Sequence, residues 1–373
     1  MWRKLAVGGG VALVVVACAA GWWLTRRPFT YEARNDPELP AVSSAEPSAH
    51  AADAGAGVVV DEELELEVGA PIELPEDAPP IVRTERLARA PSFRSTDNYL
   101  LVGVDRTWGR QWGRADTLLV AVFDDDTDHV GLVSIPRDLH VDVPGHGPAR
   151  INATLRIATN TDQDPVELIG RVVSDTLAMP IHHVVVADIE SFERTVDQVG
   201  GVTVDVPCPI QDNFIDRREP SGRRLLDVLA GRQHMDGRTA AMYVRSRHGR
   251  SDWDRARRQQ AVLLGLRRRI GDMGPTEWIP ILAEALDRGV TTTMSRLELI
   301  GLGRRVSRLA PERMHGLLLG RREVSGYRTP EGRSVLLPDF DAIDRALAGL
   351  FDAPAPGLRP ERAQCPPADA ALR

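Results

Sequence analysis

The chain has 373 residues, more than one compact domain usually needs, so we expect one or two domains with accessory segments. Its formal net charge of −7 at pH 7 argues against a general nucleic-acid-binding protein, because such proteins need a basic face to displace counterions. Almost all of the positive charge comes from arginine, since Lys4 is the only lysine. GC-rich codon usage explains that bias as readily as function does, so the positions of the arginines carry more information than their number.

The N-terminus contains an apolar segment that is predicted to cross a membrane. Leu5–Leu24 has no charged residue, and about 20 residues at about 1.5 Å each span a hydrocarbon core. The apolar run continues for six residues beyond Cys18, further than a cleaved signal needs. We therefore favour an uncleaved anchor at residues 5–25 after a cytoplasmic stub at residues 1–4. A cleaved signal peptide and a lipoprotein signal processed at Cys18 are the alternatives.

Residues 26–94 have the composition of a linker. Alanine, proline, serine and acidic residues dominate, with acidic runs such as Asp61-Glu62-Glu63. Such a stretch buries too little apolar surface to offset the entropy of ordering it, so we predict a disordered, self-repelling tether. A short pairing strand at residues 72–74 or 81–82 is the alternative for its last part.

A globular domain is predicted from about Ser95. The continuous apolar runs Tyr99–Val104 and Thr117–Phe123 are typical of strands buried on both faces. Asp124–Asp128 then predicts a solvated hairpin turn, because it lacks the spaced ligands and distal glutamate of a calcium loop. His129–Ile135 returns as the next strand.

The following segments alternate between the two kinds of periodicity. Helices are predicted at Val166–Leu177 and Ser191–Val199, and strands at His183–Asp188 and Val202–Val206. This alternation favours an α/β layer fold around a largely buried sheet for residues 95–352. Residues 353–373 form a Pro-rich tail.

Two arginines at spacing i,i+2 suggest an anion site. If Arg245 and Arg247 lie in an extended segment, both side chains leave the same face about 6.6 Å apart. Two guanidinium groups at that spacing suit the two phosphoryl groups of a pyrophosphate, because each planar fork grips phosphate oxygens. By contrast, Arg267 and Arg268 are expected on the outer side of the helix that follows.

The helix predicted from Asp252 places two polar residues on its apolar stripe. Arg255 and Gln259 are i,i+4 and share a face with apolar residues further along the helix. An arginine there needs an anionic partner, because burying an unpaired charge is very costly. The partner is either a bound anion or, in a purely structural role, Asp252 or Asp254; the sequence leaves both open.

Charged residues also cluster where the predicted strands begin and end. Asp105 ends the first strand and Asp116 opens the second, so the two carboxylates converge if those strands are neighbours. Together with phosphate oxygens they suit magnesium, and Arg114 would face the same ligand. Arg137 and Asp138 follow the third strand, at the kind of strand end where ligands gather, although surface Arg–Asp pairs are also common there.

These residues resemble the LytR-CpsA-Psr (LCP) family over roughly Asn98–Phe351. The markers occur in the family's order: Leu101–Asp105, Gly113–Thr117, Ser134–Asp138, Arg150–Ala153, Val196–Val202, Gly231–Gly237, Tyr243–His248, Asp252–Arg255 and Arg258–Gln260. The resemblance implies a three-layer domain with a central, largely buried mixed sheet flanked by helices.

The resemblance also implies a function. LCP proteins are membrane-anchored extracytoplasmic phosphotransferases that move a glycopolymer from a polyprenyl-pyrophosphate carrier to peptidoglycan, with Mg²⁺. Carried over by motif, the pyrophosphate ligands would be Arg114, Arg137, Arg245, Arg247, Arg255 and Gln259, and the metal ligands Asp105 and Asp116. Arg137 and Asp116 would be catalytic, with Asp116 assisting deprotonation of the acceptor hydroxyl.

One segment departs from the family pattern and leaves the acceptor open. After Ile151-Asn152-Ala153 the family often has an aromatic residue and a glycine-rich turn, whereas this chain continues with Thr154-Leu155-Arg156. Two other functions remain as alternatives. One is a hydrolase that uses the same site with water as acceptor, and the other is a non-catalytic glycopolymer-binding or regulatory protein.

Two cysteines lie beyond the predicted anchor. If the domain is exported, Cys208 and Cys365 lie in an oxidising compartment, where a disulfide between them would tether the tail. Two free thiols are an equal alternative, because a disulfide tolerates only a narrow range of Cα separations.

Overall fold

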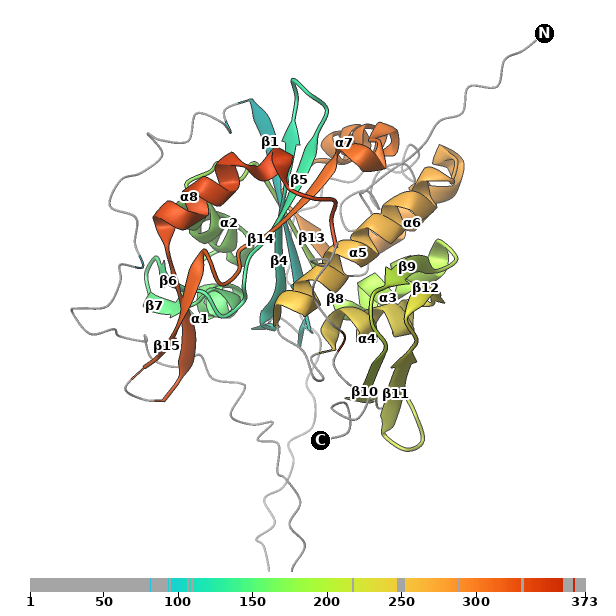
Figure 1. The fold of residues 1–373 in the computed structure, drawn as a ribbon, viewed down its shortest axis with the longest axis horizontal. Coiled ribbons are helices and arrows are strands. Elements are labelled where there is room, and N and C mark those ends of the chain that lie inside the picture. Colours follow the sequence, from blue (N-terminus) through green and yellow to red (C-terminus); the bar gives the residue numbers. More distant parts are fainter. Residues whose placement is uncertain are drawn as a thin grey trace, which may run out of the picture. The chain divides into compact units, whose positions relative to one another are not determined.

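A six-stranded mixed sheet lies at the centre of the computed structural model (Figure 1). Its strands, in spatial order, are β13 (Val290–Thr292), β8 (His183–Asp188), β1 (Thr96–Val104), β4 (Ala115–Asp124), β5 (Val130–Ser134) and β14 (Met314–Leu318). The β1–β8 and β5–β14 pairs are parallel, and the other three pairs are antiparallel. The predicted central mixed sheet is therefore confirmed.

The structure describes residues 95–105, 107–108, 111–216, 218–246, 252–287, 289–329 and 332–357, together with Ile81, Phe93 and Cys365. The predicted anchor at residues 5–25 lies outside these residues, as does the predicted linker except for Ile81 and Phe93. Phe93 is buried, and Ile81 packs against Val335 and Leu337. Within the described part of the chain, no helix combines the length and the apolar character that a membrane span requires.

Helices cover both faces of the sheet (Figure 1). One face carries α1 (Thr154–Asn160), α2 (Pro165–Leu177) and α8 (Phe340–Ala348); the other carries α3 (Ile189–Gln198), α4 (Gly237–Arg245), α5 (Asp252–Gly271), α6 (Pro275–Asp287) and α7 (Arg296–Arg308). The resulting three layers match the fold that the sequence predicted.

Burial on both faces explains the apolar runs of the central strands. Along β1, Tyr99 and Leu101 pack into the core under α5 and α7, whereas Leu100 and Val102 point to the opposite face. All four are at most 5% exposed. A strand covered on both sides favours apolar side chains on both faces, so the alternation expected of a half-exposed strand is lost.

Short antiparallel pairs surround the sheet. They are β2 (Thr107–Trp108) with β3 (Gln111–Trp112), β6 (His140–Val143) with β7 (Gly147–Arg150), β9 (Val202–Val206) with β12 (Gly231–Met235), β10 (Ile210–Ile215) with β11 (Arg223–Val228), and β15 (Val324–Arg328) with β16 (Ser334–Pro338).

The acidic segment after β4 is a hairpin turn, as predicted. The Asp124 carboxylate accepts hydrogen bonds from the Asp126 amide (2.9 Å) and the Thr127 hydroxyl (2.7 Å). Asp128 has a positive φ of 56°, a conformation that aspartate tolerates better than most residues. The carboxylates therefore stabilise the connection between β4 and β5 locally.

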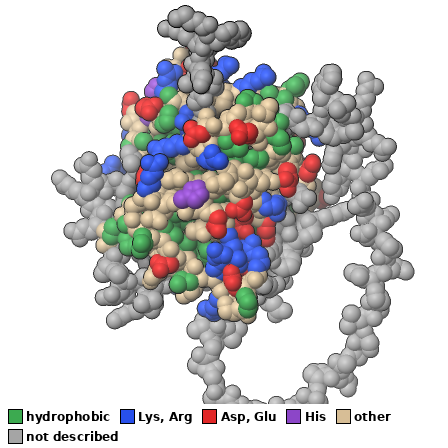
Figure 2. Space-filling view, turned by 90° about the vertical axis from the view of Figure 1, so that its right-hand side faces the viewer, with side chains coloured by type: hydrophobic (Ala, Val, Ile, Leu, Met, Phe, Trp, Pro, Cys, Tyr) green, Lys and Arg blue, Asp and Glu red, His purple; other side chains and the backbone are tan. Residues whose placement is uncertain are grey.

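An ion-pair cluster fastens the β10–β11 hairpin to α3 and α4. The Asp216 carboxylate accepts hydrogen bonds from the side chains of Arg218 (3.0 Å) and Arg238 (2.7 Å). Arg218 also pairs with Glu193 of α3 at 2.6 Å, and Arg238 with Glu219 at 3.0 Å. Figure 2 views the molecule from the side on which β9–β12 lie, and basic and acidic side chains are interspersed there. The ion pairs in this region therefore connect separate elements of the fold.

Replacing Asp216 with asparagine should destabilise the domain in a pH-dependent way. Hydrogen bonds from Arg218, and then those from Arg238, hold the pKa of Asp216 well below its usual range. The stabilisation is thus present above the unfolded-state pKa of about 3.9 and is lost as the pH falls below it. We expect a loss of about 1–2 kcal/mol at pH 7, because Arg218 is largely exposed. Urea unfolding at pH 7 and at about pH 2.5, which lies below that unfolded-state pKa, measures this loss.

The matched control for this experiment is Asp227→Asn, because Asp227 lies exposed on the same hairpin. A destabilisation by Asp216→Asn that is the same at both pH values, or no larger than that of Asp227→Asn, would contradict the role of the cluster.

A disulfide joins Cys208 to Cys365, with a Cα–Cα distance of 5.6 Å. The structure thus decides between the two alternatives that the sequence left open. Cys208 is 1% exposed and follows β9, so the bond ties the C-terminal region to the interior near α4 and α5.

Thiol labelling of the denatured, non-reduced protein should therefore leave both of these cysteines unmodified. The cause is the disulfide, which denaturation without a reductant does not open. Mass spectrometry of the labelled peptides checks this, and a reduced sample, in which both cysteines should react, is the control. Labelling of Cys208 and Cys365 without reductant would contradict the bond.

Candidate active site

A β-bulge places Asp116 at the edge of the sheet. The β1–β4 register passes from Gly103 opposite Thr117 to Val104 opposite Ala115, so Asp116 is the extra residue on β4. Gly103 permits the close approach of the strands, because a Cβ there would lie 3.0 Å from the Thr117 Cβ. Bulges re-aim side chains, and this one removes Asp116 from the regular pairing with β1.

Arg137 reaches Asp116 from the turn after β5. The Ile135 amide donates to the Leu118 carbonyl (2.9 Å), so the chain beyond β5 continues beside the start of β4. The Arg137 guanidinium there donates to the Asp116 carboxylate. Its Nε also lies 3.7 Å from Asp138 and 3.8 Å from Asp252. Arg137 is therefore held by three carboxylates and joins the sheet to α5.

Asp105 and Asp116 form the carboxylate pair that the sequence predicted. Partial removal from water, then the charge of Asp116 and a hydrogen bond between the two, raise the pKa of Asp105 above its ordinary value. Burial opposes ionisation of Asp116, but its hydrogen bond with Asp105 and the adjacent Arg137 lower its pKa. Asp116 is thus the ionised partner, and Asp105 takes up a proton more readily.

Arg245 lies beside this pair but does not come from a strand. Its Nε is 3.4 Å from the Asp105 carboxylate, and its guanidinium lies over the Phe214 ring at 5.7 Å. The predicted extended segment is wrong, because Arg245 is the last residue of α4. The Asp236 side chain caps this helix by accepting from the Thr239 amide (2.7 Å). Arg247 lies outside the described residues, so the expected pairing of the two arginines on one face is not tested.

The first turns of α5 supply the other side of the site. Arg255 is 5% exposed and lies 3.5 Å from Asp252, the structural partner that the sequence allowed. Its charge also lowers the pKa of Asp116, which places it near the carboxylate pair. Gln259 donates to the Val244 carbonyl at 3.4 Å. Arg255 therefore combines a structural ion pair with a position at the site.

A pocket with about 330 Å³ of empty space, partly open to solvent, brings these side chains together. Its polar lining consists of Asp116, Ser134, Arg137, Asp252, Arg255 and Gln259, and its apolar lining of Ile135, Pro136, Trp253, Ala256, Leu318 and Leu319. Four residues predicted from separate motifs thus meet in one pocket: Asp116, Arg137, Arg255 and Gln259.

Two of the predicted site residues, Asp105 and Arg114, do not line this pocket. Asp105 is 47% exposed and reaches the site through its contacts with Asp116 and Arg245. Arg114 is half-buried at the residue before β4, and it forms no ion pair with another residue that the structure describes.

The donor set suits a hard divalent cation. Two adjacent carboxylates, one with a raised pKa, are an arrangement that a bound cation would stabilise. Among the described residues, no group of three or more His, Cys, Asp or Glu side chains could enclose a metal. Further ligands would have to be water or substrate oxygens, as is usual for Mg²⁺.

Comparison with known proteins decides the family. The model described as the LytR_cpsA_psr family matches residues 82–343. This chain belongs to the LytR-CpsA-Psr family. Four of the motifs from which the sequence predicted it contribute residues to the pocket: Gly113–Thr117, Ser134–Asp138, Asp252–Arg255 and Arg258–Gln260.

Two curated LCP relatives carry the same descriptive name, polyisoprenyl-teichoic acid–peptidoglycan teichoic acid transferase. TagU of Oceanobacillus iheyensis is 31% identical over 168 residues, covering 44% of this chain and 49% of TagU. TagV of Bacillus subtilis is 26% identical over 245 residues, covering 64% of this chain and 60% of TagV. The matches thus span only about half of each relative.

The crystal structure of B. subtilis TagV shares the LCP fold. It aligns with a TM-score of 0.57 at 24% identity, over 70% of this chain and 98% of that chain.

Sequence reasoning missed two contributors to the LCP site. Asp252 was considered only as a partner of Arg255, yet it also lies near Arg137. Phe214 belongs to β10, a strand that the sequence did not predict, and it packs under Arg245. Gln211–Ile215 shows no polar–apolar alternation, because three polar residues precede two apolar ones, so the sequence carried no period-two signal for this strand. The reference residue Arg267 was also misplaced: it is 6% exposed, because α5 packs on several sides, whereas Arg268 is exposed as expected.

Proposed function

We propose that this protein is a membrane-anchored, extracytoplasmic phosphotransferase that moves a glycopolymer from a polyprenyl-pyrophosphate carrier to a hydroxyl group of peptidoglycan. The observation that carries the proposal is the convergence of Arg137, Arg245 and Arg255 on the carboxylate pair Asp105 and Asp116. Phosphoryl transfer requires chiefly positioning and charge neutralisation, which these arginines and a cation held by the carboxylates would provide.

Each residue has a role in this reaction. Arg137, Arg245 and Arg255 bind the pyrophosphate oxygens and balance the charge that develops on them. Arg114, Arg247 and Gln259 complete this set by their family motifs. The ionised Asp116 accepts the proton of the acceptor hydroxyl. That oxygen forms a bond to the glycan-side phosphorus, the bond from this phosphorus to the bridging oxygen breaks, and polyprenyl monophosphate leaves.

Asp105 and Asp116 would hold Mg²⁺ together with pyrophosphate oxygens. The cation supplies Lewis-acid stabilisation of the phosphoryl oxygens when it is bound. The Asp105 side chain is nearly half open, so it is accessible to such a ligand. Arg245 stays within reach of Asp105 and couples the metal site to the anion site.

The proposed compartment rests on two features. Leu5–Leu24 is apolar and long enough to anchor the chain. The disulfide between Cys208 and Cys365 is typical of proteins that fold in an oxidising space. Both support a domain on the outer side of the membrane, where peptidoglycan is assembled.

The relatives' names support the donor and acceptor classes but not a particular cargo. TagU and TagV are named for the transfer of teichoic acid from a polyisoprenyl carrier to peptidoglycan. For this chain we propose a glycopolymer without specifying its sugars, because the polar residues of the described pocket that have a proposed role bind the pyrophosphate or the metal, and none is assigned to a sugar.

The test supplies the purified full-length protein with a synthetic polyprenyl-pyrophosphate-linked oligosaccharide, MgCl₂ and peptidoglycan fragments. We expect polyprenyl monophosphate and an oligosaccharide joined to peptidoglycan through a phosphodiester, detected by mass spectrometry. Release of oligosaccharide phosphate without attachment would instead identify a hydrolase. Binding of the donor without turnover would identify a non-catalytic binding protein.

A further inference from the structure

The C-terminal end of α4 positions Arg245 and leaves carbonyl groups that the helix itself does not satisfy. The last four carbonyls of a helix have no intrahelical donor. Here, side chains of α5 supply donors for them. Arg258 Nε donates to the Tyr243 carbonyl at 3.0 Å and Arg258 Nη2 to the Ser246 carbonyl, while Gln259 donates to Val244.

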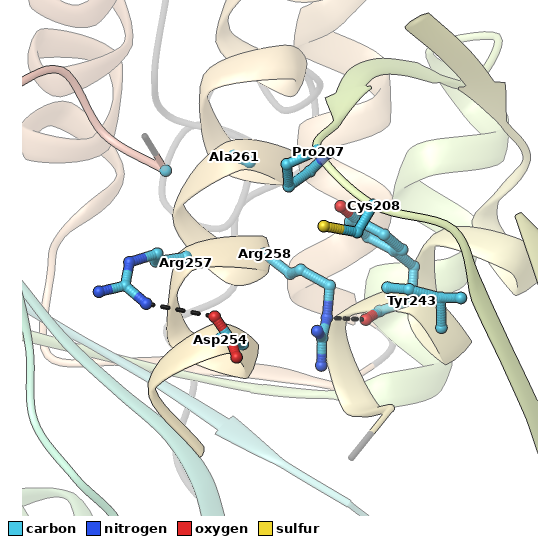
Figure 3. Close-up of a pocket in the computed structure, with 9 residues that line it drawn as sticks. Pro207, Cys208, Tyr243, Asp254, Arg257, Arg258 and Ala261 are labelled. Atoms are coloured by element: carbon cyan, nitrogen blue, oxygen red, sulfur yellow. Dashed lines mark hydrogen bonds and ion pairs between the residues drawn. The ribbon is translucent and has the colours of Figure 1, made fainter. Parts of the chain in front are cut away.

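Arg258 makes this contact from the interior of the domain. It is 4% exposed, and its guanidinium lies over the Tyr243 ring at 5.7 Å. Figure 3 shows Arg258 reaching from α5 to the Tyr243 backbone, while its neighbour Arg257 points away toward Asp254. The negative end of the α4 dipole helps to offset the cost of burying the Arg258 cation.

A residue of β10 also fixes the last turn of α4. The Ser246 hydroxyl donates to the Asp212 carboxylate of β10 at 2.7 Å, and Ser246 is 1% exposed. The residue between these fixed points, Arg245, is the one that extends toward Asp105. Its direction therefore depends on a backbone that α5 and β10 hold together.

We propose that Arg258 is a positioning residue for the pyrophosphate site: it braces the last turn of α4 so that the Arg245 guanidinium is held at the anion and Asp105. This inference rests on the proposed function, because it assumes that Arg245 binds pyrophosphate. Arginine is required, since one planar fork bonds two carbonyls three residues apart. A lysine carries the charge but has no such fork.

The test compares Arg258→Ala with Arg257→Ala in the full-length protein. Arg257 is adjacent on the same helix and pairs with Asp254 at 3.2 Å within α5, without a hydrogen bond or ion pair to any described residue of α4, so it is a matched control. The probe is inorganic pyrophosphate with MgCl₂, measured by calorimetry. We expect Arg258→Ala to bind about tenfold more weakly, the change that loss of one charge-assisted hydrogen bond produces, and Arg257→Ala to bind as wild type.

Chemical rescue distinguishes positioning from a general loss of structure. A second pocket, partly open to solvent, is lined by Arg258, Tyr243 and Arg257, so the position that the Arg258 guanidinium vacates borders solvent from which guanidinium ion can enter (Figure 3). Guanidinium should restore pyrophosphate binding to Arg258→Ala. If Arg258→Ala bound pyrophosphate weakly only because the variant is unstable, guanidinium would weaken the binding further, because guanidinium favours unfolding.

If Arg258→Ala does not fold, Arg258→Lys is measured in its place. It should fold, because the ammonium can reach one carbonyl, but bind more weakly than wild type. Wild-type affinity in either folded Arg258 variant, or the absence of guanidinium rescue, would overturn the positioning role. Failure of the wild-type protein to bind pyrophosphate would instead overturn the proposed function.

Discussion

Replacing Asp116 with asparagine should abolish most transferase activity while the fold is retained. The amide cannot accept the acceptor's proton and is a poor ligand for Mg²⁺, so turnover should fall by about 10²–10⁴-fold. Arg137 keeps its contacts with Asp138 and Asp252, which preserve the turn after β5. The measurement is the rate of polyprenyl monophosphate release from the donor substrate, with circular dichroism to verify folding.

Two controls accompany this variant. Asp205→Asn changes an exposed carboxylate that pairs only loosely with Arg268, at 3.7 Å, and should be fully active. EDTA should inactivate the wild-type protein, and added MgCl₂ should restore it. Undiminished turnover both in Asp116→Asn and in EDTA would favour a metal-independent reaction that does not use this carboxylate.

Arg245→Ala should weaken binding of a polyprenyl pyrophosphate by about 1.5–3 kcal/mol, the contribution of a charge-assisted hydrogen bond. That loss corresponds to roughly a ten- to hundredfold higher Kd. The Arg245 side chain is 39% exposed, so its removal should not disrupt the core. Calorimetric titration or fluorescence with a short-chain polyprenyl pyrophosphate measures the change.

Arg268→Ala is the appropriate reference for this experiment. The Arg268 side chain is 50% exposed on α5 and pairs with Asp205 on β9. Arg268→Ala therefore removes the same charge as Arg245→Ala, but outside the site. Arg267 is unsuitable, because it is buried. If Arg245→Ala and Arg268→Ala bound the ligand equally well, Arg245 would not belong to the anion site.

The strands of the central sheet were predictable because burial on both faces leaves a simple pattern. Tyr99–Val104 and Thr117–Phe123 are apolar at nearly every position, and both became inner strands. The antiparallel β1–β4 pair then brings Asp105 and Asp116 together, as the sequence suggested on the condition that the strands were neighbours. The bulge at Asp116 was not predictable, because it depends on the register between the two strands.

The end of α4 was mispredicted because local and long-range signals conflict there. Tyr243-Val244-Arg245 reads as extended when considered alone, since tyrosine and valine favour strands. The helix begins much earlier, at the cap formed by Asp236, and Ala240 and Ala241 favour its continuation. Donors from Arg258 and Gln259, on a different helix, satisfy its last turn. Those contacts exist only in the folded chain.

The contacts of Arg137 also could not be predicted from the sequence. A strand end with Arg137 and Asp138 suggested a ligand site, but the sequence could not specify which carboxylates surround the guanidinium. Asp252 lies more than a hundred positions further along the chain and reaches Arg137 only because α5 packs beside β14 and bonds to β5 through Gln260. Motif order predicted the members of the site, and packing determined their partners.

The bond between Cys208 and Cys365, 157 positions apart, closes a covalent ring that contains α4 and α5. An endoprotease that cuts once between the two cysteines would leave both fragments joined. Nicked and intact protein should then migrate together on a gel without reductant and separate only after reduction.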